Sequence, residues 1–344
     1  MVDARRSRVV APRFVGQRRL VEAEHVVEAV GPGQLLVEVR ANAICGTDRD
    51  LWENGWPVTP GHEAAGVVVG VGPGTITAPG TLGVVYLMDF CGTCRSCRLG
   101  ATNQCLAKRG DFGFTRDGGY GPLAVVSESA FFPIDHDIDP AEATLLLDVM
   151  GTSGHAIARA RLIRPDIESV VIAGAGPIGL GLAAMVRILL GSATTVIVGD
   201  VDTARLAIAE TLGARVADLR STSMADAMRA SGSDGGADAA FDSAGRTVTR
   251  EGLLEALGKR GVLVCVGHGE GLTLDVSRDL IGPERAVLGS EYFRFDALPA
   301  NLALLRAHRA VLATIITHRF PRSRLGEALA TFFAGGTGKV IVEA

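Results

Sequence analysis

Four closely spaced cysteines constrain the fold of this chain more than any other feature. They follow the pattern C-x2-C-x2-C-x7-C, at Cys91, Cys94, Cys97 and Cys105. Structural zinc is held tetrahedrally by such thiolates, each roughly 2.3 Å from the metal, and small residues between the cysteines allow tight turns. The spacing therefore predicts a closed structural zinc site in a lobe over residues 88–108. Two disulfides among the same four cysteines are the alternative.

The composition indicates a large globular protein without a nucleic-acid or membrane partner. The chain has 344 residues, 47% of them hydrophobic, and a formal net charge of −4. These values favour two domains and give no basic excess for nucleic acid or anionic lipid. The sequence contains no apolar run of about 18 residues, so we expect no transmembrane helix. The basic N-terminus lacks the apolar stretch of a signal peptide, so we do not expect secretion. We expect a cytoplasmic protein, where thiols stay reduced.

Two regions of the chain differ in their pattern of apolar and turn-forming residues. Up to about residue 155, short Val-rich segments such as 35–40 and 64–72 are broken by Gly and Pro, which predicts a compact, barrel-like β domain. From 156 to 294, strand-like segments alternate with helical ones, which predicts a doubly wound parallel sheet and an α/β fold class. A last strand, over 338–343, is expected to return to the first domain.

A glycine-rich loop follows the strand predicted at 169–173. Its G-x-G-x-x-G glycines are Gly174, Gly176 and Gly179, and a helix is predicted directly after them. This context predicts a dinucleotide site, in which the glycines allow the turn, the approach of a pyrophosphate and close helix packing. Asp200, at the end of the next strand, would bind a ribose diol and repel a 2′-phosphate, which favours NAD over NADP.

The other residues expected to bind the cofactor are Pro177, Ile178, Arg205, Val266 and Gly267. For Arg205, a solvated position on its helix is the alternative.

A second set of metal-binding residue types lies in the β-rich domain. Cys45 begins the segment Cys-Gly-Thr-Asp, and His62 is followed by Glu63. A lone cysteine or histidine is usually an ordinary core residue, as we expect for Cys265 in its apolar strand. Cys45 and His62, however, share a domain with the four-cysteine lobe and precede a dinucleotide fold, and for that reason we pair them as ligands of a second metal ion.

In this order the motifs resemble those of the zinc-containing medium-chain alcohol dehydrogenases, over nearly the whole chain. The segments that carry the resemblance are Cys45-Gly-Thr-Asp, Gly61-His-Glu, the four-cysteine lobe, Gly174-Ala-Gly-Pro-Ile-Gly and Gly338-Lys-Val-Ile-Val. The resemblance implies a GroES-like catalytic domain from residues 1–155 and 295–344, and a Rossmann NAD-binding domain from 156–294. It also implies a catalytic zinc beside the structural one, and a homodimer or homotetramer.

The resemblance further assigns roles to single residues. Cys45 and His62 match two ligands of the catalytic zinc, Asp148 stands where a third is usually Cys or Glu, and Glu63 would be an exchangeable fourth. A cap or surface carboxylate is the alternative for Asp148. Thr47 would pass the alcohol proton outward, and the relay would end at Asp50 or in water. Asp48 would anchor the loop.

Glu63 and His155 resemble the sorbitol, threonine and glucose dehydrogenase branch. This implies an NAD-dependent oxidoreductase acting on a secondary alcohol of a sugar, polyol or aminocyclitol, or on the corresponding ketone. The expected substrate contacts are Trp52, Glu53 and Trp56, with Glu291 and Tyr292 facing the cleft; mere packing is the alternative for the tryptophans. A zinc-free reductase of quinones or enoyl compounds and a non-catalytic scaffold are the alternative functions.

Overall fold

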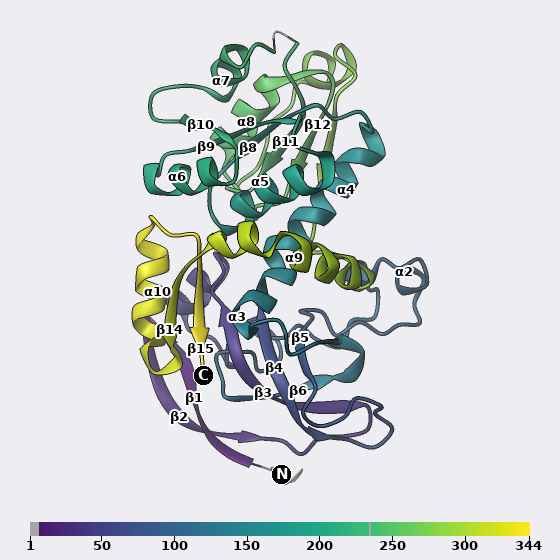
Figure 1. Cartoon of the computed structure of the whole chain (residues 1–344), viewed down its shortest axis with the longest axis vertical. Helices are drawn as coiled ribbons and strands as arrows, with labels where there is room; N and C mark the ends of the chain where they lie inside the picture. Colours follow the sequence, from purple (N-terminus) through teal and green to yellow (C-terminus); the bar gives the residue numbers. More distant parts are fainter. Residues whose placement is uncertain (1–6, 234) are drawn as a thin grey trace.

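The computed structural model describes residues 7–233 and 235–344, which form two parts stacked along the longest axis of the molecule (Figure 1). The upper part in Figure 1 contains a six-stranded parallel sheet, and the lower part contains a seven-stranded mixed sheet. None of the described helices is long and apolar enough to cross a membrane. The predicted α/β fold, with a β-rich part and a doubly wound parallel sheet, is confirmed.

The lower sheet joins strands from both ends of the sequence. Its order is β14-β15-β3-β4-β5-β7, and β6 pairs with β3. The last strand runs antiparallel to β3, which confirms the prediction that it returns to the first domain. The strands are β3 (Gln34–Ala43), β4 (Ala64–Val71), β5 (Leu82–Val85), β6 (Leu123–Ser127), β7 (Phe131–Ile134), β14 (Ile316–Pro321) and β15 (Lys339–Glu343).

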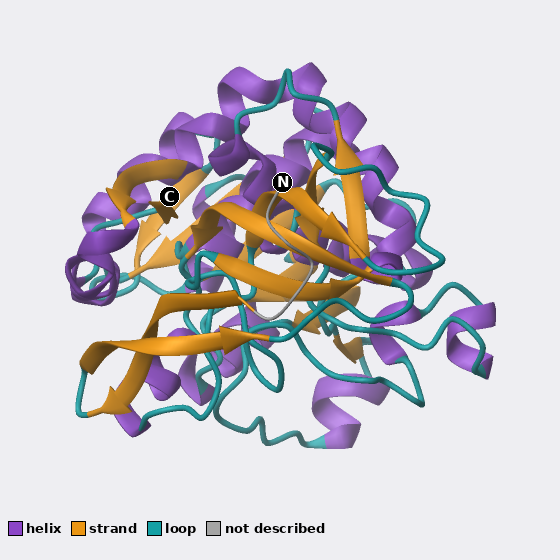
Figure 2. Cartoon of the chain, turned by 90° about the horizontal axis from the view of Figure 1, so that it is seen from below, coloured by secondary structure: helices purple, strands orange, loops and turns teal. Residues whose placement is uncertain are grey.

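Alternating apolar residues explain the lower sheet. Leu35, Val37 and Val39 of β3 share one buried cluster with Val68 and Phe131, as expected for a strand with one face on the core. Figure 2 views this part from below, with its strands in orange and helices around them. A separate hairpin and four short helices complete it: β1 (Ser7–Gly16), β2 (Arg19–Val27), α1 (Asp48–Asn54), α2 (Arg95–Arg98), α3 (Pro140–Ala143) and α10 (Leu325–Ala334).

The upper sheet has the order β10-β9-β8-β11-β12-β13. Its central strands are buried on both faces: Val170 and Ile172 of β8 face one core cluster, and Val171 and Ala173 face the other. The elements are β8 (Ser169–Ala173), β9 (Thr195–Asp200), β10 (Arg215–Asp218), β11 (Ala237–Asp242), β12 (Leu257–Cys265), β13 (Ala286–Gly289), α4 (Ser153–Ile163), α5 (Pro177–Leu190), α6 (Thr203–Thr211), α7 (Met224–Ala230), α8 (Thr247–Ala256) and α9 (Leu298–Leu312).

The two parts share one hydrophobic core. Leu147 of the lower part and Phe293, just after the upper sheet, belong to the same buried cluster as Ile172. The Phe293 ring lies so close to Gly151 that an added Cβ there would come within 2.4 Å of it. Helix α4 runs through the predicted domain limit at 155/156, and the predicted limits stay predictions.

Candidate metal and cofactor sites

Four polar side chains from separate segments meet at a largely buried point in the lower part. They are Cys45, just after β3, His62 and Glu63, just before β4, and Asp148, which begins a π-helical turn ahead of α4. One ligand atom from each lies within 4.8 Å of every other. The Cys45 Sγ lies 3.3 Å from Asp148 Oδ2, and His62 Nε2 lies 3.7 Å from the same oxygen.

These separations suit tetrahedral zinc. Ligand atoms at roughly 2.0–2.3 Å from such an ion are roughly 3.3–3.8 Å from one another. The Asp148 carboxylate oxygen is already at such distances from the Cys45 sulfur and from the His62 imidazole nitrogen. Asp148 reaches the others although its side chain is one methylene shorter than that of Glu, because its turn lies beside them.

The buried charges explain why the cluster would exchange protons for a cation. Burial raises the pKa of the Cys45 thiol, and the Asp148 charge raises it further. Burial lowers the pKa of His62, but its hydrogen bonds to Asp148 and Cys45 outweigh this and raise it well above its usual value. Burial opposes ionisation of Asp148, yet His62 holds the pKa of Asp148 at about 2. A metal ion would replace the protons that His62 and Cys45 carry.

Glu63 forms an ion pair with Lys339 of β15 in the protein interior. Both side chains are fully buried, and Lys339 Nζ donates to Glu63 Oε1. The other oxygen, Oε2, has no hydrogen-bond partner among the described residues. Burial and then the Asp148 charge raise the pKa of Glu63 to about 8, against the opposing effect of Lys339. The sequence analysis missed Lys339, although a lysine in a strand of Val and Ile was a usable signal.

Asp48 anchors the loop that carries Cys45, as predicted. Its Oδ2 accepts hydrogen bonds from Cys45 N at 3.0 Å and from the Tyr120 hydroxyl at 2.6 Å. Thr47 and Asp50, the predicted proton relay, lie exposed at the start of α1. Their role in proton transfer stays a prediction.

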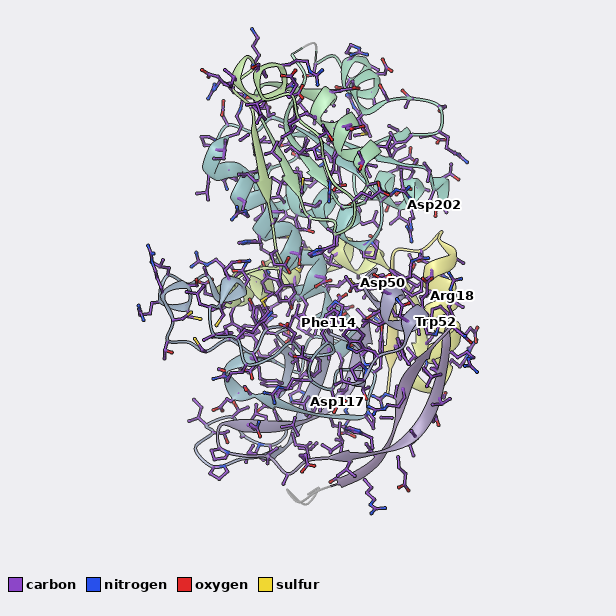
Figure 3. The ribbon with its side chains drawn as sticks, turned by 180° about the vertical axis from the view of Figure 1, so that it is seen from behind. Arg18, Asp50, Trp52, Phe114, Asp117 and Asp202 are labelled. Carbon is purple, nitrogen blue, oxygen red and sulfur yellow. The ribbon has the colours of Figure 1, made fainter. Side chains whose placement is uncertain are left out.

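The three predicted substrate contacts around α1 have protein partners. Trp52 is buried and stacks on Phe333, with ring centroids 5.9 Å apart, and Glu53 pairs with Arg18 at 2.6 Å. Figure 3 shows Arg18, Asp50 and Trp52 on the same side of the lower part. Packing therefore describes Trp52 better than a substrate platform does, and contact of Glu53 with substrate stays a prediction.

Trp56 supports the buried cluster of Cys45, His62, Glu63 and Asp148 indirectly. Its indole Nε1 donates to the carbonyl of Phe114 at 2.7 Å. The Phe114 ring packs against the imidazole of His62, with centroids 4.9 Å apart. Trp56 thus holds the segment that covers one face of His62, a contact that sequence spacing does not reveal.

The four cysteines of the lobe lie around α2, nearer to solvent than the buried cluster. All six cysteines are free thiols, so the disulfide alternative is not found. The Sγ atoms of Cys91 and Cys97 are 4.0 Å apart, as are those of Cys94 and Cys105, close to the roughly 3.8 Å edge expected around zinc. Their convergence fits the predicted structural zinc, which itself stays a prediction.

Backbone N–H groups of the lobe prepare its thiols for a metal. The amides of Thr93 and Cys94 lower the pKa of Cys91 to about 6, and the amides of Cys97 and Leu106 lower the pKa of Cys94. Burial raises the pKa of Cys97 to about 12. Two of the four thiols are thus already biased toward the thiolate form that zinc requires.

The glycine loop has the geometry of a phosphate-binding turn. Gly174 has φ of 96°, where glycine is favoured, and a Cβ on Gly179 would lie 1.8 Å from the Gly174 carbonyl oxygen. Nothing lies closer than 4.0 Å to a Cβ built on Gly176, so the loop leaves room there. Pro177 and Ile178 begin α5, whose N-terminus receives no side-chain cap from the described residues, so the N–H groups that follow Pro177 can donate to an anion.

Asp200 stands at the end of β9, beside the loop. Its Oδ2 accepts from Ala175 N at 2.5 Å and its Oδ1 accepts from Asp202 N at 2.9 Å. Arg205 donates to the carbonyl of Thr337 at 3.0 Å, which ties α6 to the segment before β15. A solvated Arg205 is therefore not what the structure shows. The predicted contact of either residue with a cofactor stays a prediction.

A cavity of about 520 Å³ lies at the carboxyl ends of β12 and β13. Val266, Gly267 and Glu291, which the sequence analysis assigned to cofactor and substrate, all line it. Cys265 lines it as well, so it is not the wholly buried core thiol that we expected. Tyr292 is buried and has φ of 47°, an uncommon conformation for a non-glycine residue.

Comparison with known proteins identifies two matching families. Residues 31–136 match the model "Alcohol dehydrogenase GroES-like domain", and residues 177–307 match "Zinc-binding dehydrogenase". An L-threonine 3-dehydrogenase from Saccharopolyspora erythraea is 31% identical over 334 residues, covering 91% of this chain and 92% of the relative. Another, from Rhizobium rhizogenes, is 29% identical and covers 93% and 94%.

Solved structures agree with these matches. A zinc-binding dehydrogenase from Sinorhizobium meliloti, bound to NADP, superimposes with a TM-score of 0.86. It is 28% identical, and the alignment covers 98% of this chain and 100% of that one.

Proposed function

This chain belongs to the zinc-containing medium-chain alcohol dehydrogenases, and from that premise we propose that it transfers a hydride between a secondary alcohol and NAD. Cys45, His62 and Asp148 would hold a catalytic zinc, and the four cysteines of the lobe would hold a structural one. The observation that carries the proposal is the meeting of a thiol, an imidazole and a carboxylate within 4.8 Å. Glu63, with its unpartnered Oε2, is proposed as the exchangeable fourth ligand.

The residues around the buried cluster would support the chemistry of zinc and NAD. Zinc supplies Lewis acidity that lowers the pKa of an alcohol toward neutrality, and NAD accepts the hydride. Asp48 fixes the Cys45 loop through its two hydrogen bonds, and Phe114 shields one face of His62 from water. Lys339 balances the charge of Glu63, so that the cluster keeps a second carboxylate in a buried place.

The proton of the alcohol needs a path to solvent. Thr47 lies two residues after Cys45 and is exposed, and Asp50 is exposed on the first turn of α1. We propose that the Thr47 hydroxyl takes the proton and that Asp50 or water receives it. Replacing Thr47 with Val should slow hydride transfer and shift its pH profile, whereas Thr47→Ser should retain both.

NAD is the proposed cofactor because a carboxylate, Asp200, ends β9 beside the glycine loop. A ribose diol can donate hydrogen bonds to it, whereas a 2′-phosphate would be repelled. Replacing Asp200 with Ala should weaken NADH binding and relax the preference against NADPH. Unchanged discrimination would contradict this assignment.

The proposed substrates are secondary alcohols of sugars, polyols or aminocyclitols. The two curated relatives carry the name of an enzyme acting on L-threonine, an amino acid whose hydroxyl is also a secondary alcohol. Hydroxylated amino acids therefore join the substrates to be tested.

The decisive experiment combines metal analysis with a substrate screen. We expect two zinc ions per chain and NAD reduction with at least one secondary alcohol; Cys45→Ser should lose one zinc and the activity. If the protein binds two zinc ions and NAD but oxidises no alcohol, the proposed function is wrong. A zinc-free protein that reduces quinones or enoyl compounds would support the alternative reductase.

The resemblance also leads us to propose a homodimer or homotetramer in the cytoplasm, with domain limits at 155/156 and 294/295. Light scattering of the purified protein tests the assembly, and a monomer would contradict it.

A further inference from the structure

The cavity at the ends of β12 and β13 lies at the end of the cofactor crevice that is remote from Asp200. Asp200 ends β9, and the strand order β9-β8-β11-β12 puts β12 three strands away, roughly 14 Å at about 4.8 Å per strand. Ligands of such sheets bind along the carboxyl ends of the strands. With adenosine near β9 and phosphates at the glycine loop before α5, the reacting end of the dinucleotide and its substrate would therefore reach this cavity.

The cavity lies near the buried cluster of Cys45, His62, Glu63 and Asp148, although none of these four residues lines it. Glu291, on its wall, lies near enough to Asp148 for the two charges to interact. Phe293, two residues later, packs against Gly151 in the turn that begins with Asp148. A substrate whose hydroxyl points to the cluster can thus extend its other end into the cavity.

One positive charge on the cavity wall has no partner. Glu291 is paired with His268, with 3.2 Å between Oε2 and Nε2. Arg159, on the second turn of α4, is half-buried and makes no hydrogen bond or ion pair with any residue of 7–233 and 235–344. Its Nε is buried without an acceptor. A half-buried guanidinium without a partner costs free energy, because it has lost part of its hydration, unless an anion binds to it.

The neighbours of Arg159 do not supply that anion. His155, one turn earlier on α4, is neutral near pH 7, because burial and then the charge of Arg159 lower its pKa to about 4. Its Nε2 lies 3.4 Å from the side-chain nitrogen of Asn103, which in turn donates to the carbonyl of Glu291 at 2.7 Å. These groups are uncharged polar contacts beside the Arg159 guanidinium.

Resting on the proposed dehydrogenase function, we propose that Arg159 binds a carboxylate at the non-reacting end of the substrate. The preferred substrate is then a secondary alcohol that carries a carboxylate, such as a hydroxy acid, sugar acid or hydroxylated amino acid. A guanidinium presents paired N–H donors that match the two oxygens of a carboxylate. Neutral polyols would leave this group unpaired and bind more weakly.

The test uses pairs of alcohols that differ only by a carboxylate in place of CH2OH. Suitable pairs are D-gluconate with D-sorbitol, 3-hydroxybutyrate with 1,3-butanediol, and L-threonine with L-threoninol. In the wild-type holoenzyme, kcat/KM with NAD should favour the carboxylate in at least one pair. Arg159→Gln should lower that value about 10- to 100-fold, as expected for loss of a charge-assisted hydrogen bond. The neutral partner should change less than about 2-fold, and Arg159→Lys should retain part of the preference.

Arg161 provides the matched control, since it is an exposed arginine on the same helix and does not line the cavity. Arg161→Gln should leave both members of each pair unchanged. An equal loss for charged and neutral members in Arg159→Gln would overturn the proposal. So would weaker binding of NADH alone, because Arg159 would then serve the cofactor. The melting temperatures of Arg159→Gln and Arg161→Gln show whether either variant has a folding defect. If Arg159→Gln is destabilised, the carboxylate preference of Arg159→Lys tests the proposal in its place.

A binding measurement separates this inference from the proposed function. The complex of the protein with NADH is titrated with 3-hydroxybutyrate and with 1,3-butanediol, and NADH fluorescence is followed. Carboxylate binding that is lost in Arg159→Gln supports the inference even if no alcohol is oxidised, in which case the dehydrogenase proposal alone is wrong. Oxidation of neutral alcohols without selective carboxylate binding overturns the inference alone.

Discussion

The two cysteine-containing clusters of this protein are built in opposite ways. In the lobe, amides of the same short turns donate to the sulfurs, and the pKa of Cys91 falls to about 6. In the buried cluster, burial raises the pKa of Cys45, and Glu63 reaches about 8. The lobe assembles from residues within one short segment, whereas the buried cluster needs β3, β4, α4 and β15 in place. Local amides prepare one site and the whole fold prepares the other.

The difference indicates what each site can do. The lobe offers four thiols and would leave no open position on a tetrahedral zinc, so we assign it to stability. The buried cluster combines different ligand types with a carboxylate whose second oxygen is unpartnered, which suits an ion that must also accept a substrate.

Replacing one cysteine in each cluster should have the greatest effect, and the effect should differ between the two clusters. Cys45→Ser should lower kcat/KM at least about 10³-fold, because Lewis-acid stabilisation of several kcal/mol is lost, with little change in melting temperature. Cys97→Ser should instead lower the melting temperature and the zinc content. Normal melting of Cys97→Ser together with loss of activity alone would contradict the division.

The next effect concerns the ion pair beneath the buried cluster. Lys339→Met should lower the free energy of unfolding by about 1–3 kcal/mol, because Glu63 Oε1 loses its buried hydrogen-bond donor, while Glu63, whose pKa is already about 8, takes up a proton and does not remain charged. Urea denaturation measures this. Lys339→Arg is the matched control, and the double variant Lys339→Met with Glu63→Gln should recover much of the loss. An unchanged free energy of unfolding in Lys339→Met would show that the contact between Lys339 and Glu63 does not stabilise the fold.

A smaller effect tests whether the lobe is independent of the cofactor end. Asn103→Leu removes the hydrogen bond to the carbonyl of Glu291 and should cost about 1–2 kcal/mol. Gln104→Ala, at the exposed neighbouring position, is the control and should be neutral. If Asn103→Leu is equally neutral in urea denaturation, the lobe and the 291–295 segment are not coupled.

The smallest effect is the pH dependence of the ion pair at the cavity. The hydrogen bond to Glu291 raises the pKa of His268 above 6.5, so its stabilisation is full below 6.5 and is lost as pH rises through the raised value. His268 in turn lowers the pKa of Glu291 below 4.5, so that contribution is lost as pH falls through the lowered value. Because both side chains are partly exposed, the total is below about 1 kcal/mol. Melting of His268→Gln and wild type should differ at about pH 5.5 and converge at about pH 9.

Much of the fold followed from sequence because its signals are local. The strand before Gly174 and the Val-rich last strand depend on neighbouring residues, and both lie where the sequence predicted them. The spacing of the four cysteines is equally local, and their sulfurs lie close together. The pairing of Cys45 with His62 came from their position in the domain of the four-cysteine lobe, and Asp148 was added from the resemblance; the structure brings the three side chains together. Lys339, Asn103 and Arg159 were missed because their importance arises from contacts between segments far apart in the chain.

The substrate contacts predicted around Trp52 show that contacts between distant segments can also make a sequence-based prediction of a site fail. A tryptophan and a glutamate in a short loop look available in the sequence. Contacts with Phe333 and Arg18, which lie in other segments, engage both. Aromatic and acidic residues can be recognised in a sequence, but the direction in which their side chains point depends on contacts with other segments, which the sequence of the loop does not reveal.

The ion pair between Glu63 and Lys339 also affects the order in which the protein can mature during synthesis. The two residues are 276 positions apart, and the whole upper sheet is encoded between them. A ribosome releases Glu63 long before Lys339, so the nascent first domain must wait with an unpaired acidic group in its interior, or stay open. Metal loading of the buried cluster is therefore expected late, after β15 has docked, whereas the lobe can take its ion as soon as residues 91–105 have emerged.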